Sequence, residues 1–101
     1  KFDFSGNIIG ILTLNMGEDY PVSAVVDRNN GFAYFGTATR PGPGNVVRIK
    51  LSDFSRLDAI TLDTGEDELY SAVIDEVNRF AYFGTGTVPG KIVKVRLGCG
   101  Y

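Results

Sequence analysis

The sequence contains no histidine and a single cysteine, Cys99, among its 101 residues. Without histidine, a Ser-His-Asp or Cys-His catalytic unit cannot form, and a histidine-ligated metal is excluded. One cysteine cannot form an intrachain disulfide or a zinc site built on paired thiolates. Cys99 lies between two glycines near the end of the sequence, where a thiol without a neighbouring base is a poor nucleophile. These absences predict a protein that is not an enzyme.

Basic charge and long apolar runs are also missing. The formal net charge of −2 and the pI near 4.9 leave no basic surplus for phosphates, which argues against a nucleic-acid partner. No apolar run approaches the ~20 residues that span a bilayer, and residues 1–14 lack the pattern of a signal peptide. The sequence opens on Lys1 inside what reads as a repeat, which suggests processing or excision from a longer protein.

The main positive feature is an internal repeat. Residues 17–42 and 65–90 are identical at 17 of 26 aligned positions, with an offset of 48 residues. A period near 50 that is filled with short strands is typical of β-propeller blades. We therefore expect one repeat domain over residues 1–101, with repeat 1 at about 14–51 and repeat 2 at about 62–97.

Both repeats predict the same strands. A β-branched run ends at Asp27 or Asp75, a hairpin turn follows, and the next run reads FAYFGT in both copies. Aromatic residues on both faces of FAYFGT predict a strand covered on both sides. The expected strands are residues 8–14, 22–27, 32–37, 46–51, 57–62, 70–75, 80–85 and 91–97. The side chains expected to be buried between blades are Ala24, Val25, Phe35, Ala72, Val73 and Phe83.

These strands predict an all-β fold of two four-stranded antiparallel blades. Residues 8–14 and 91–97 each lack a neighbouring strand, so the N-terminal strand is expected to act as the outer strand of the last blade. Two blades cannot close a ring, since propellers have ~4 to 8. The ring is therefore completed by self-association, with a trimer favoured over a dimer or tetramer, or by a longer chain. An eight-stranded barrel or sandwich is the alternative topology.

The sequence YFGT, with a short VVD strand before it and VVRIKLSDFSRLDAITL after it, resembles the YVTN and NHL-like family of propeller repeats. The resemblance covers nearly all of the chain. It implies a propeller fold and, because such repeats occur in surface-layer, adhesion and extracellular proteins, an extracellular or cell-surface location. Some members are enzymes, but no catalytic residue transfers by motif.

The acidic loops are the candidate ligand site. Strands alternate direction within a blade, so the GED loops and the TxTxPG loops are expected on one face of the ring. Oxygen-rich loops of this kind are suited to sugar hydroxyls or to Ca²⁺, although we predict no required cofactor. The alternative is that GED and TPG simply encode turns. The candidate residues are Glu18, Asp19, Tyr20, Thr39, Arg40, Glu66, Asp67, Glu68 and Thr87.

Three functions are compatible with these features. The expected one is a binding or adhesion module for a protein or glycan, without nucleic-acid binding or membrane insertion. A purely structural repeat is the second, supported by the absence of an unrepeated chemical cluster. A propeller enzyme with a metal in its channel is the third, and the missing histidine argues against it.

Overall fold

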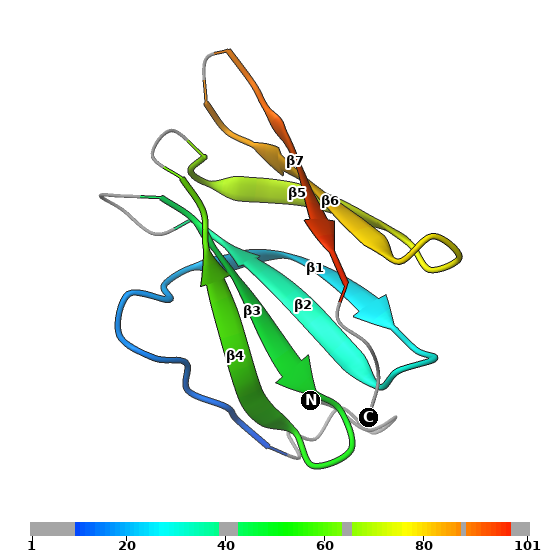
Figure 1. Ribbon diagram of the computed structural model, residues 1–101. Helices are drawn as coiled ribbons and strands as arrows, with labels where there is room; N and C mark the ends of the chain where they lie inside the picture. Colours follow the sequence, from blue (N-terminus) through cyan, green and yellow to red (C-terminus); the bar gives the residue numbers. More distant parts are fainter. Residues whose placement is uncertain (1–9, 39–42, 64–65, 88, 98–101) are drawn as a thin grey trace, which may run out of the picture.

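The structure, a computed structural model, describes residues 10–38, 43–63, 66–87 and 89–97 (Figure 1). Within these ranges the chain is all-β, as the sequence predicts, and no helix could cross a membrane. The strands form two antiparallel sheets, in the orders β1-β2-β3-β4 and β5-β6-β7. Their bounds are β1 Pro21–Asp27, β2 Phe32–Thr37, β3 Asn45–Lys50, β4 Ser55–Thr61, β5 Leu69–Asp75, β6 Phe80–Thr85 and β7 Ile92–Arg96.

The two sheets share one pairing register. Ala24 lies opposite Phe35 in the first sheet, and Ala72 lies opposite Phe83 in the second. A register shift follows Pro21, and the same shift recurs in the second sheet 48 residues later. Because register decides which face each side chain occupies, equivalent residues of the two sheets point in equivalent directions.

The second sheet has three strands, so the prediction of two four-stranded blades is wrong in this respect. The eighth strand was to come from residues 8–14. Residues 10–14 are not in a strand, and residues 8 and 9 lie outside the described ranges. Leu12 and Leu14 instead pack over the first sheet with Phe35 and Phe54. A strand needs a backbone ladder partner, and no described strand pairs with residues 10–14 in the single chain.

The two sheets stack through opposite faces. Val25, Tyr34 and Val46 of the first sheet share a buried core with Phe83 and Ala81 of the second. In the repeat, Phe83 corresponds to Phe35, which lies on the other face of the first sheet and belongs to a separate apolar cluster. The inner face of one sheet is therefore the equivalent of the outer face of the other.

This stacking decides which burial predictions hold. Val25 and Phe83 are buried as predicted, and Phe35 and Ala72 are half-buried. Ala24 and Val73 are exposed, which contradicts the prediction for the single chain. Both lie on the outer faces of the two-sheet stack, where no third sheet covers them.

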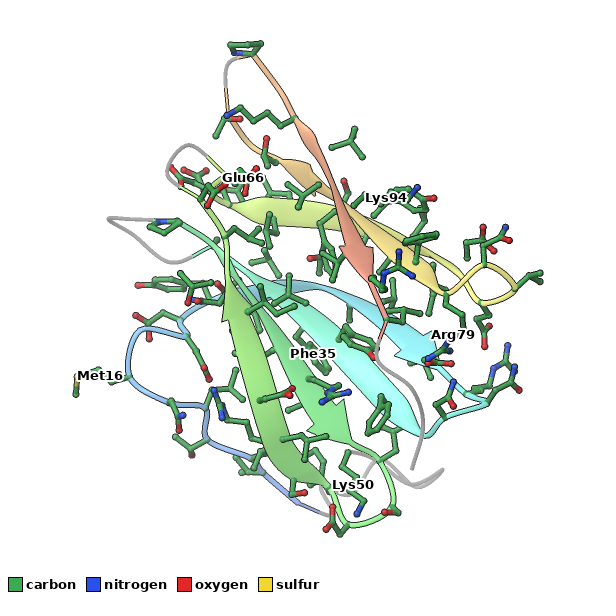
Figure 2. The ribbon with its side chains drawn as sticks, viewed as in Figure 1. Met16, Phe35, Lys50, Glu66, Arg79 and Lys94 are labelled. Carbon is green, nitrogen blue, oxygen red and sulfur yellow. The ribbon has the colours of Figure 1, made fainter. Side chains whose placement is uncertain are left out.

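An ion pair joins the sheets at the hairpin end of β1. Asp27 is fully buried, and its carboxylate accepts hydrogen bonds from Nδ2 of Asn30 at 3.1 Å and from a guanidinium nitrogen of Arg79 at 2.7 Å. Figure 2 shows Arg79 reaching from the β5–β6 turn toward the end of β1. Arg79 has a φ of 68°, and its counterpart in the first repeat is Gly31, with a φ of 76°. Arg79 therefore occupies a left-handed position that favours glycine.

We expect Phe83→Ala to lower the free energy of unfolding by about 3–5 kcal/mol, because it opens a cavity between the sheets. Val77→Ala, at a residue of the β5–β6 turn that is 90% exposed, is the control and should change it by less than about 0.5 kcal/mol. Urea denaturation followed by circular dichroism measures both. Equal losses in the two variants would show that the sheets do not pack on Phe83.

Candidate functional site

The loops before β1 and β5 and those after β2 and β6 lie at one end of the two sheets, here called the loop end. Within each sheet, a backbone hydrogen bond of 2.9 Å joins the two loops: Ala38 N–H donates to Tyr20 O, and Gly86 N–H donates to Glu68 O. A further 2.9 Å bond, from Gly44 N–H to Glu66 O, connects the loops of the two repeats. The loop end is therefore one continuous surface that both repeats build.

Glu18 and Glu66 close equivalent turns. The carboxylate of Glu18 accepts the backbone N–H of Asn15 at 3.0 Å, and that of Glu66 accepts the N–H of Asp63 at 2.9 Å. The reverse bonds, from the glutamate N–H to the carbonyl three residues earlier, are 3.0 Å in both turns. Both carboxylates thus have a structural use, as the turn interpretation of the GED sequence predicts.

Glu18 has a second partner. Its carboxylate receives two hydrogen bonds from the guanidinium of Arg56 in β4, at 2.8 and 2.5 Å. This bond lowers the pKa of Glu18 below its ordinary value of 4.5; burial of the carboxylate opposes the effect, and the N–H of Asn15 adds to it. A charged, bidentate pair of this kind fixes the loop before β1 against the first sheet.

Two tyrosines line a hollow at the loop end. Tyr20, which is 68% exposed, and Tyr70 surround a space of about 380 Å³ together with Val22 and Ala38. The hydroxyl of Tyr70 donates to Glu68 at 2.8 Å, which places a carboxylate beside its ring. Aromatic rings edged by hydrogen-bonding oxygens are suited to a ligand with one apolar and one polar side.

The other candidate residues of the loops are Asp19, Asp67, Thr87, Thr39 and Arg40. Asp19 is exposed, and one carboxylate oxygen of Asp67 is buried without a hydrogen-bond partner. The hydroxyl of Thr87 lies 2.6 Å from that of Thr85 and donates to the carbonyl of Pro89, so its own loop uses it. In the described ranges, no group of three or more acidic side chains or cysteines is placed to hold a metal ion. Thr39 and Arg40 lie outside the described residues.

The structure brings Tyr20 together with a residue that the sequence analysis did not select. Tyr70 lies at the start of a predicted strand, and was interpreted only as a strand residue. An alignment of the two repeats could have pointed to Tyr70, because the repeats differ at both tyrosine positions: Tyr70 aligns with Val22, and Tyr20 aligns with Glu68. The partner of Glu18, Arg56, is 38 residues away and matches no local pattern.

Comparison of the chain with protein-family models, with curated proteins and with solved structures gave no match.

We expect Glu18→Gln to lower the free energy of unfolding by about 1 kcal/mol at pH 7, since an ion pair at the surface contributes about that much. Glutamine keeps an oxygen for the N–H of Asn15 but cannot pair with Arg56. Because folding lowers the pKa of Glu18, the contribution is present above about pH 4.5 and is lost as the pH falls through the lowered pKa.

Urea denaturation from pH 7 to pH 3 measures this difference between the Gln variant and the unchanged chain. The difference should shrink as the pH falls below 4.5, because the carboxyl becomes protonated as the pH passes through its lowered pKa. Arg56→Met should reproduce the loss at pH 7, and the double variant should add little to it. A loss that is the same at every pH would contradict a role for the charge of Glu18.

Proposed function

We propose that the two sheets are neighbouring blades of a β-propeller and that the chain is a non-catalytic binding or adhesion scaffold. The main support for this proposal is the way in which the two sheets stack. Two equivalent sheets, 48 residues apart, pack so that the inner face of one corresponds to the outer face of the other. A sandwich related by a two-fold axis would bury equivalent faces, whereas repeated blades around a ring bury opposite ones.

A ring requires more blades than one chain supplies. Further blades would join at the outer faces of both sheets and at the edge of β7, which pairs with only β6 among the described strands, so we propose self-association into a closed ring. Three copies, giving six blades, are favoured, and two or four copies also close a ring of known size. A longer chain with further repeats is the alternative source of blades.

The loop end is the proposed ligand surface. Tyr20 and Tyr70 form the walls of its hollow, and Glu68 contributes an acceptor at the edge. Of the two expected ligand classes, this favours a glycan, because the apolar face of a sugar ring stacks on an aromatic ring while its hydroxyls bond to neighbouring oxygens. The resemblance to surface-protein repeats supports an extracellular or cell-surface location for such a module.

We expect Tyr20→Ala and Tyr70→Ala each to weaken glycan binding at least tenfold, by removing a stacking wall of the hollow. Met16→Ala is the matched control, because Met16 is fully exposed in the turn before Tyr20 and does not line the hollow. Binding is measured on an immobilised panel of neutral oligosaccharides and then by calorimetry with the strongest member. If no oligosaccharide binds, or if the tyrosine variants bind as well as the control, the purely structural repeat becomes the better interpretation.

A further inference from the structure

We propose that the outer face of the second sheet docks on the outer face of the first sheet of a second copy. The contact would repeat the one that joins the two sheets inside the chain. This inference rests on the proposed propeller architecture and identifies the surfaces and the charge that its self-association uses.

The outer face of the second sheet has the composition of a buried inter-sheet face. Val25, in the core of the first sheet, is 7% exposed, whereas its equivalent Val73 is 64% exposed. The aromatic and cationic residues beside them correspond as well. Arg48 lies 4.7 Å from the ring centre of Phe32 on the inner face, and on the outer face of the second sheet Lys94 lies 4.1 Å from the ring centre of Phe80. An exposed copy of an interface that is buried elsewhere in the chain indicates a docking surface.

The outer face of the first sheet provides the complementary surface. Phe35 and Val47 occupy the positions that Phe83 and Val93 hold in the contact inside the chain. Val47 is already buried within its own chain, so Phe35 is the member of this pair that a second copy would cover. Phe35 is only partly covered, and it lines an apolar hollow of about 140 Å³ with Leu14 and Phe54. A second copy that docks here would cover Val73 on one molecule and Phe35 on the other.

The N-terminal segment is already placed for this contact. Leu62, just after β4, packs against the core between the sheets, and its equivalent Leu14 packs on the outer face of the first sheet. Leu14 therefore has the position, relative to the first sheet, that Leu62 has relative to the second. Figure 1 shows the segment that contains Leu14 in blue, running beside the first sheet before β1. A docked second copy would bring its β7, whose outer edge pairs with no described strand, to this segment, and β7 would give residues 10–14 the ladder partner that no described strand of their own chain provides.

The proposed contact between two copies lacks a cation that the contact inside the chain has. Inside the chain, Arg79 bonds to the buried Asp27. The equivalent of Asp27 is Asp75, which accepts hydrogen bonds from Asn78 of its own turn but forms no ion pair with a described residue. In a docked pair, Asp75 would face position 31 of the second copy, where the residue is glycine. Self-association through this contact is therefore weaker than the contact inside the chain, and a cation at position 31 should strengthen it.

The first experiment tests the face. Val73→Glu places a charge on a side chain that is exposed in the single chain, so it should leave the unfolding curve of the dilute monomer nearly unchanged while raising the dissociation constant at least a hundredfold. Val77→Glu makes the same change in the neighbouring turn, outside the docking face, and should leave association as it is. Sedimentation velocity from 1 to 500 μM measures both variants beside the unchanged chain. Equal association of the two variants would overturn the proposal.

The second experiment tests the charge. Gly31→Arg should lower the dissociation constant about tenfold at low salt, as expected for one charged hydrogen bond across the contact. A side chain at position 31 meets no atom within 4 Å, and Arg79 shows that this turn position accepts arginine. Gly17→Arg, at a left-handed glycine of the loop end, is the control and should have no effect. Adding Asp75→Asn to Gly31→Arg should abolish the gain.

The outcomes separate this inference from the proposed function. A chain that remains monomeric at 500 μM would overturn the docking surface together with the proposed self-association, and a longer chain would then be the source of further blades. A Gly31→Arg gain that survives Asp75→Asn would overturn the docking surface alone. Neither result would affect oligosaccharide binding by the loop end, which both tyrosines form within one chain. Association that follows these expectations without any oligosaccharide binding would instead support the ring and contradict the binding function.

Discussion

The buried carboxylate of Asp27 is the interaction on which the arrangement of the two sheets depends. A carboxylate removed from water requires compensating hydrogen bonds, and removing its charged partner is destabilising because the carboxylate stays buried. Asn30 supplies a local hydrogen bond, but the cation, Arg79, comes from the other sheet, 52 residues away. The second sheet must therefore approach so that its β5–β6 turn lies against the end of β1. Apolar packing around Phe83 holds the sheets together, and the ion pair adds a directional contact at one end of them.

Because of this contact, equivalent residues of the two repeats differ in solvent exposure. The sequence FAYFGT forms β2 in one sheet and β6 in the other, yet only β2 is packed against other elements on both faces. On the outer face of β6, Phe80 and Tyr82 are half-buried and have the side chain of Lys94 over their rings. The local sequence is identical, so the difference arises entirely from position in the stack. The outer face of the first sheet is covered in part by Leu12, Leu14 and Phe54, whereas on the outer face of the second sheet Val73 is 64% exposed.

The seven strands β1 to β7 were predictable because they depend on alternation and on turn residues, which are local. The strand expected at residues 8–14 is not present over residues 10–14. The exposure of Val73 was not predictable, because its surroundings in the sequence match those of the buried Val25. The pairing of Glu18 with Arg56 depends on how a loop crosses a sheet, and no spacing rule describes it. Of the two tyrosines that line the hollow, the sequence selected only Tyr20, through the repeated loop that contains it. Tyr70 reaches the hollow because of the way the two sheets stack.

Some of the differences between the two repeats lie where the repeats touch each other. Arg79 replaces Gly31 at the ion pair, and the exchange of Tyr20 for Glu68 and of Val22 for Tyr70 produces a hollow with one tyrosine from each repeat. Two identical repeats would give each blade either both aromatic positions or neither. The hollow therefore belongs to the pair of sheets, so in a ring of identical chains it would occur once per chain and not once per blade. A ligand that bridges several hollows would then encounter sites separated by two blades, which sets the spacing for multivalent binding.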